Sequence, residues 1–243
     1  MRKVAIIQAR MGSTRLPGKV LKDIAGTTML ARVVERALRA SEIDEVVIAT
    51  TIEPADNDVI AECERLGVAS FRGSALDVLD RYWQAAQRFG ADAVIRITSD
   101  CPLIDPGVID EVARSFLREP ADYASNTFQR TYPRGLDAEI MTVNALFQAW
   151  RDARLPYQRT HVTPYLYQNP GIFKLVPVLG EADHSAYRWT VDTQADLDLV
   201  RAVYERLGSN GAFDWRAILQ LMQDEPALVE LNRHILQKQL QEG

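Results

Sequence analysis

The sequence predicts an α/β protein in which helices cover both faces of a mostly parallel sheet. Short apolar runs alternate along the chain with stretches whose apolar residues recur at helical spacing, a pattern typical of βαβ units. A length of 243 residues and a hydrophobic content of 47% provide enough apolar material for one sizeable core. We therefore expect a single domain over residues 1–243.

Each element follows from its local pattern. In the first half, strands are predicted at 4–8, 46–50, 68–71 and 93–97, and helices at 29–40, 55–66 and 78–89. A helix over 108–117 is predicted to begin near Asp105 and Pro106, because both residue types are favoured at helix starts. In the second half, strands are predicted at 122–124, 138–141, 172–178 and 187–191, and helices at 157–167, 195–207 and 213–240.

One region interrupts this alternation. Residues 126–136 are polar and contain Pro133 and Gly135, which favours a loop. The aromatic-rich stretch that follows ends at the turn-forming residues 169–171. We assign residues 126–171 to an inserted arm or lid that covers the site or forms a dimer contact.

Composition excludes several classes of protein. A net charge of -5 argues against a surface that binds nucleic acid by neutralising many phosphates. No stretch approaches the roughly 20 apolar residues of a membrane-spanning helix, and the start does not resemble a signal peptide, so we expect a cytoplasmic protein. Cys63 and Cys101 have no metal-site or disulfide spacing, and Cys101 has no identifiable partner that would activate it as a nucleophile.

The most informative segment is residues 8–19, which follows the first predicted strand. It places Arg10, Arg15 and Lys19 among small residues. Loops that leave the carboxyl ends of parallel strands commonly bind ligands, and their glycines let backbone N–H groups approach phosphate oxygens. The three cations are therefore candidates for neutralising a triphosphate, although a solvated basic turn has the same composition.

Two better-known phosphate loops do not fit this segment. A Walker A loop has four residues between its glycines and Ser or Thr after its Lys, whereas five residues separate Gly12 from Gly18 and Val20 follows Lys19. The GxGxxG pattern of dinucleotide-binding proteins is also missing.

The string QARMGSTRLPGKVL closely resembles the opening of sugar-activating cytidylyltransferases, which include the 3-deoxy-manno-octulosonate and acylneuraminate enzymes. The resemblance is strongest to the spore-coat polysaccharide biosynthesis branch. It extends to GSALDVLDRYWQAA at 73–86, RITSDCPLID at 96–105, DYASNTFQRTYPRGLDAEI at 122–140 and WTVDT at 189–193. The resemblance implies a three-layer, Rossmann-like nucleotide-diphospho-sugar transferase fold and a homodimer.

The resemblance also implies an activity. It indicates magnesium-dependent transfer of CMP from CTP to a 2-keto sugar acid, such as a nonulosonic acid, with release of pyrophosphate for surface glycan synthesis. Two alternatives stay open: a nucleotidyltransferase that uses another nucleoside triphosphate and a sugar phosphate, and a catalytically silent nucleotide-binding protein.

Asp100 and Asp192 are the candidate Mg²⁺ ligands. Each follows a predicted strand, and Mg²⁺ commonly takes one or two carboxylates together with water and substrate phosphates. Turn formation or helix capping is the competing role for an Asp at such a position. The resemblance assigns magnesium binding to both, although acylneuraminate enzymes have a second Asp where this chain has Thr190.

The resemblance names two further groups of residues. Nucleotide binding is assigned to Gln8, Ala9, Arg10, Gly12, Ser13, Arg15, Lys19, Arg72, Ser74, Asp77 and Thr98, with Arg10, Arg15 and Lys19 also catalytic. Acceptor binding is assigned to Asn126, Arg130, Tyr132, Arg134, Asp137, Glu139 and His161. The arginines of this group suit an acidic acceptor, because a guanidinium donates two parallel hydrogen bonds to a carboxylate.

Overall fold

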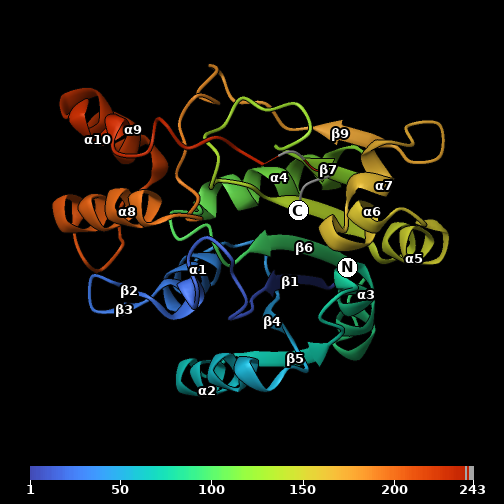
Figure 1. The fold of residues 1–243 in the computed structure, drawn as a ribbon. Coiled ribbons are helices and arrows are strands. Elements are labelled where there is room, and N and C mark those ends of the chain that lie inside the picture. The colour runs from blue at the N-terminus through green and yellow to red at the C-terminus, as the bar shows by residue number, and fades with distance from the viewer. Residues whose placement is uncertain (239, 241–243) are drawn as a thin grey trace.

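The computed structural model describes residues 1–238 and 240 and has a seven-stranded sheet at its centre (Figure 1). The strand order is β5 (Ala69–Gly73), β4 (Glu45–Thr51), β1 (Lys3–Gln8), β6 (Ala93–Thr98), β8 (Glu139–Thr142), β7 (Tyr123–Ser125) and β9 (Leu175–Pro177). Among the described strands of this sheet, β8 alone pairs antiparallel with its neighbours, β6 and β7. The remaining pairs are parallel, which confirms the prediction of a mostly parallel mixed sheet.

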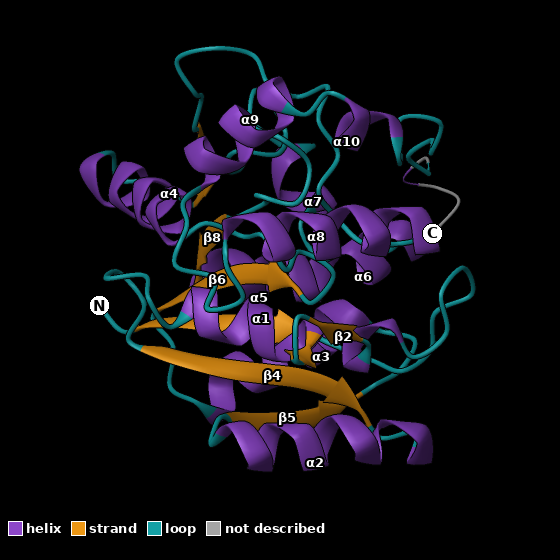
Figure 2. Cartoon of the chain, turned by 90° about the vertical axis from the view of Figure 1, so that its left-hand side faces the viewer, coloured by secondary structure: helices purple, strands orange, loops and turns teal. Residues whose placement is uncertain are grey.

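Helices cover both faces of the sheet (Figure 2). One face packs on α1 (Met29–Ala37), α2 (Asn57–Leu66), α4 (Pro106–Arg118), α8 (Gln194–Leu207), α9 (Trp215–Asp224) and α10 (Ala227–Glu230). The other packs on α3 (Val78–Arg88), α5 (Val143–Asp152), α6 (Pro156–His161) and α7 (Pro164–Tyr167). Alternate strand residues enter the two cores: Ile7 faces the first group of helices and Ile6 the second.

Several predicted boundaries are wrong, and prolines explain two of them. The predicted helix 157–167 is two helices, because the ring of Pro164 cannot continue α6 and Val162 adopts a left-handed φ of 72°. The predicted helix 213–240 is also two shorter helices: α9 ends at Asp224, before Pro226, and α10 ends at Glu230. Position 239 of this prediction lies outside the described residues.

Other differences concern short or weakly patterned segments. Helix α5 and the hairpin of β2 (Asp23–Ile24) and β3 (Thr27–Thr28) were not predicted, nor were the 3₁₀ turns at Lys19–Leu21 and Pro54–Asp56. The predicted strand 172–178 shrinks to β9. The predicted strand 187–191 is irregular and retains one bridge, between Arg134 and Arg188.

Residues 126–171 do not stand apart as the expected arm or lid. Strand β8 lies inside the sheet, and α5 and α6 both pack against α3. The physical reason is the apolar content of the segment: Ile140 and Met141 enter opposite cores, and Leu146 of α5 is fully buried. The helices of the described chain include none with the length and apolar character needed to cross a membrane.

Candidate active site

A cavity of about 820 Å³ opens at the carboxyl ends of β1 and β6. Most of the predicted site residues line it, namely Gln8, Ala9, Arg10, Gly12, Ser13, Arg15, Lys19, Thr98, Asp100, Arg134, Asp137, His161 and Asp192. Parallel strands deliver their following residues to one edge of the sheet, so segments distant in sequence meet here.

The loop after β1 is held at both ends. The backbone N–H of Met11 donates to Oδ1 of Asp56 at 2.6 Å, and the N–H of Gly18 donates to the carbonyl of Met11 at 3.1 Å. Gly18 has a left-handed φ of 64°, a conformation that glycine adopts without steric cost. The closed loop directs Lys19 back toward the sheet.

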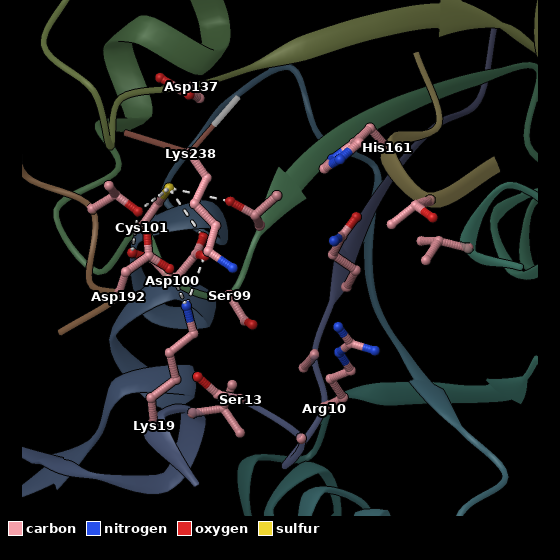
Figure 3. Close-up of a pocket in the computed structure, with 18 of the residues that line it drawn as sticks. Arg10, Ser13, Lys19, Ser99, Asp100, Cys101, Asp137, His161, Asp192 and Lys238 are labelled. Atoms are coloured by element: carbon pink, nitrogen blue, oxygen red, sulfur yellow. Dashed lines mark hydrogen bonds and ion pairs between the residues drawn. The ribbon is translucent and has the colours of Figure 1, made fainter. Parts of the chain in front are cut away.

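Lys19 joins the two predicted metal ligands (Figure 3). Its Nζ lies 3.0 Å from Oδ2 of Asp100 and 2.9 Å from Oδ1 of Asp192, and donates to the carbonyl of Val191 at 2.8 Å. The N–H of Val191 donates in turn to the carbonyl of Asp100 at 2.8 Å, which ties the two carboxylate-bearing segments together. The two aspartates therefore converge, although an irregular segment rather than a strand delivers Asp192.

The opposite charges in this cluster stabilise one another. Burial lowers the pKa of Lys19, but the nearby carboxylates outweigh it and raise the pKa, so the ammonium stays charged. Burial raises the pKa of Asp100, but the charge of Lys19 and hydrogen bonds hold that pKa well below its usual range. Asp192 has two further cations, Arg15 at 3.0 Å and Arg188 at 2.9 Å.

These donors fit a magnesium ion. Two carboxylates already surround one cation, the Lys19 ammonium, and carboxylate oxygens are the ligands Mg²⁺ prefers. The described residues include no group of three or more His, Cys, Asp or Glu placed to enclose a metal. Such a site suits an ion that completes its coordination with water and substrate phosphates, instead of one that is bound by protein ligands alone.

Cys101 lies beside the aspartates as a buried thiol. Its Sγ is 3.2 Å from Oγ1 of Thr98 and 3.7 Å from Oδ1 of Asp100. Burial and the charge of Asp100 raise the pKa of the thiol well above its usual value. A neutral thiol is a poor nucleophile, which agrees with the lack of an activating partner for Cys101 in the sequence.

Three predicted nucleotide-binding residues do not reach the cavity. Arg72 donates to the carbonyls of Thr51 and Glu53, at 2.8 and 2.9 Å. The hydroxyl of Ser74 accepts from the N–H of Asp77 at 2.9 Å, and Asp77 caps α3 and pairs with Arg159. Arg72 is therefore committed to the end of β4 and the loop after it, and Ser74 and Asp77 to the turn between β5 and α3.

Four predicted acceptor residues also face elsewhere. Asn126 is fully buried and bonds the backbone at Leu136 and Ala138, which fixes the shape of the loop. Glu139 is engaged by Arg96 and Tyr123. Arg130 and Tyr132 also lie outside the lining of this cavity.

Arg130 holds Asp137 through a two-bond contact at 2.6 and 2.9 Å, so it acts behind a cavity residue rather than on the cavity wall. Tyr132 points into a separate cavity and packs against Trp215.

Several cavity residues were missed from the sequence. Arg81, which lies in the predicted helix 78–89 and was not a candidate site residue, is 2% exposed and lines the cavity. Its position three residues after Val78, on the same side of α3, is the signal that was available. Gln237 and Lys238 also line the cavity, in a stretch for which the sequence predicts a helix and no site residue. Further polar lining residues that were missed are Thr14, Arg96, Ser99, Thr160 and Thr190.

The fold and the site together define the class of protein. The sheet is open and mostly parallel, and its carboxyl edge carries a cationic loop and paired carboxylates, so this is an α/β protein with an anion-binding site. Residues 4–235 match the family model described as cytidylyltransferase. The chain therefore belongs to the cytidylyltransferase family and is a nucleotidyltransferase, which confirms the resemblance.

Individual relatives agree with this family. The chain is 32% identical over 228 residues to the spore coat polysaccharide biosynthesis protein SpsF of Bacillus subtilis, covering 91% of this chain and 94% of that protein. It is 30% identical over 241 residues to a 3-deoxy-manno-octulosonate cytidylyltransferase of Solibacter usitatus, covering 90% and 93%. A solved cytidylyltransferase from Leptospira borgpetersenii aligns with a TM-score of 0.91 at 35% identity, covering 98% of this chain and all of that one.

Proposed function

We propose that this cytidylyltransferase transfers CMP from CTP to a 2-keto sugar acid, such as a nonulosonic acid, with release of pyrophosphate. The observation that carries the proposal is the position of Lys19 between Asp100 and Asp192, at the end of a cationic loop. The names of the relatives from Bacillus subtilis and Solibacter usitatus support an acidic sugar as acceptor and a role in surface glycan synthesis. A homodimer belongs to the same proposal.

The chemistry requires positioning and neutralisation of charge. An acceptor oxygen attacks the α-phosphorus of CTP, and the bond from this phosphorus to the pyrophosphate oxygen breaks. In our proposal Arg10, Arg15 and Lys19 bind the triphosphate and stabilise the charge that develops on it. Mg²⁺, held by Asp100 and Asp192, would supply further positive charge at the phosphates when bound.

The other end of the cavity is assigned to the acceptor. Arg134, Asp137 and His161 line it and belong to the group proposed from sequence. Arg134 is suited to the acceptor carboxylate, since its side chain forms no ion pair with the described residues. Arg130 and Asn126 support this region through Asp137 and the loop backbone.

A substrate panel tests the proposed reaction. Pyrophosphate release is measured with CTP, UTP, GTP or ATP, each combined with 2-keto sugar acids or with hexose 1-phosphates. We expect turnover with CTP and a sugar acid, its loss in EDTA and its return with Mg²⁺. Turnover only with another triphosphate and a sugar phosphate would contradict the proposal, as would nucleotide binding without turnover across the panel.

Asp56 is expected to be a positioning residue for the cationic loop. It is buried and accepts hydrogen bonds from the N–H of Met11 and the hydroxyl of Thr51. Asp56→Ala should raise KM for CTP about tenfold and lower the free energy of unfolding by about 2 kcal/mol, because a buried hydroxyl and a partly buried backbone N–H lose their partner. Steady-state kinetics and urea denaturation measure the two effects. Asp58→Ala, at an exposed position of the same helix start, is the control and should change neither.

A further inference from the structure

A second cavity, of about 540 Å³, lies between the amino ends of α4 and α9 and the loop 179–184. It shares no lining residue with the active-site cavity among the described residues. Tyr132 lines the second cavity, whereas Arg134 and Asp137 of the same loop line the first. Its volume is within the range of small-molecule sites.

Three aromatic side chains form one wall of this cavity. The ring of Trp215 meets Tyr132 edge-on at a centroid distance of 5.5 Å and His184 at 5.9 Å. The packing is well defined, because the backbone N–H of Trp215 donates to Oδ2 of Asp105 at 2.9 Å and the N–H of His184 donates to the carbonyl of Thr131 at 2.7 Å. A rigid aromatic wall offers apolar surface at low entropic cost.

The polar side-chain groups of this wall form no hydrogen bonds with the described residues. Tyr132 is 8% exposed, and its hydroxyl has no hydrogen-bond partner within the described part of the chain. The indole N–H of Trp215 and the imidazole nitrogens of His184 likewise have none there. A hydroxyl, an indole N–H and an imidazole that line a cavity without a protein partner are available to hydrogen-bond with a ligand there.

The charged side chains around the cavity disfavour an anionic ligand, and Arg216 competes with a cationic ligand for the aromatic wall. The Arg216 guanidinium lies 5.0 Å from the Trp215 ring centroid and so takes the position over the indole that a ligand cation would need. Asp105 is committed to the start of α4 and to Trp215. Glu111 and Glu181 also line the cavity, and their carboxylates would repel an anion.

A neutral ring with several hydroxyl groups satisfies all of these features. Its C–H faces pack on aromatic rings, and each hydroxyl both donates and accepts hydrogen bonds. The donors are Tyr132, Trp215 and His184, and the acceptors are Glu111 and Glu181. We propose that this cavity is a carbohydrate-binding site for a neutral pyranose ring, separate from the active site and independent of the proposed reaction.

Titration of the full chain with methyl α-glucopyranoside or methyl α-mannopyranoside tests this site by NMR. The chain has four tryptophans, so four indole N–H resonances are expected, and Trp215→Phe identifies the one that belongs to Trp215. We expect at least one pyranoside to shift the Trp215 resonance and to leave the other three in place. Tyr132→Phe should weaken this binding about tenfold, because it removes only the hydroxyl. Tyr157→Phe, which removes a tyrosine hydroxyl bonded to Gln168 elsewhere, should bind as the wild type does.

Other outcomes would overturn the proposal. The site is not a pyranose site if neither sugar shifts the Trp215 resonance up to its solubility limit, or if benzyltrimethylammonium shifts it and the sugars do not. Binding that is unchanged in Tyr132→Phe would also contradict the assignment. A parallel CTP titration reports on the active-site cavity, so failure there is distinguishable from failure at this site.

Discussion

Lys19→Ala is expected to lower kcat/KM by at least about a thousandfold while the protein stays folded. The Lys19 side chain is 12% exposed, and its ammonium contacts both aspartates at the end of the loop that we propose binds the triphosphate. Removing it takes away a charge that no neighbouring residue can replace from the same position. Turnover of CTP with a sugar acid measures the effect, and circular dichroism confirms the fold.

The same variant has a second expected property. Without Lys19, the carboxylates of Asp100 and Asp192 face each other and lose their shared cation, so like charges repel. Mg²⁺ alone should therefore raise the Tm of Lys19→Ala more than that of the wild type, because an ion that binds only the folded state stabilises it. Thermal melts of both proteins, with and without Mg²⁺ and with no other divalent cation present, measure this difference in Tm.

Lys22→Ala is the matched control for both properties. Lys22 follows the loop by three residues and forms no ion pair within the described chain. Its replacement should leave turnover and the response to Mg²⁺ unchanged. Activity at the wild-type level in Lys19→Ala would remove Lys19 from the catalytic machinery.

The elements that could be predicted from the sequence are those whose pattern is local. Strands β1, β4 and β6 are mainly apolar runs, and their position inside the sheet follows from burial on both faces. Because parallel strands end at one edge, the loop after β1 and Asp100 after β6 could be placed together without coordinates.

The rest depended on contacts between distant parts of the chain. Helix α5 has an apolar face, but its partner α3 lies about sixty residues earlier in the sequence. In the irregular segment after β7, side-chain direction follows no period, so nothing local distinguished Tyr132, which faces the second cavity, from Arg134, which faces the first. The return of Gln237 and Lys238 to the active-site cavity has no sequence signal at all.

Gly135→Ala is expected to show how tightly this segment is constrained. Gly135 has a φ of 106°, which disfavours any residue with a Cβ atom. An added Cβ would lie 2.6 Å from the carbonyl carbon of Trp189 and 2.7 Å from the backbone nitrogen of Thr190. Both neighbours are backbone atoms, so neither can rotate out of the way. We expect the free energy of unfolding to fall by about 3 kcal/mol and the Tm by about 6–12 °C.

The consequences should extend to the acceptor end of the active site. The N–H of Trp189 donates to the carbonyl of Arg134 at 2.7 Å, and the N–H of Arg134 donates to the carbonyl of Tyr187 at 3.0 Å. Pushing these segments apart displaces Arg134, so KM for the sugar acid should rise more than KM for CTP. Gly171→Ala is the control, since a Cβ there meets no atom within 4 Å. A Gly135→Ala protein with wild-type Tm and KM values would show that the loop relaxes freely, and its close contact with residues 187–190 would then not position the acceptor-binding side chains.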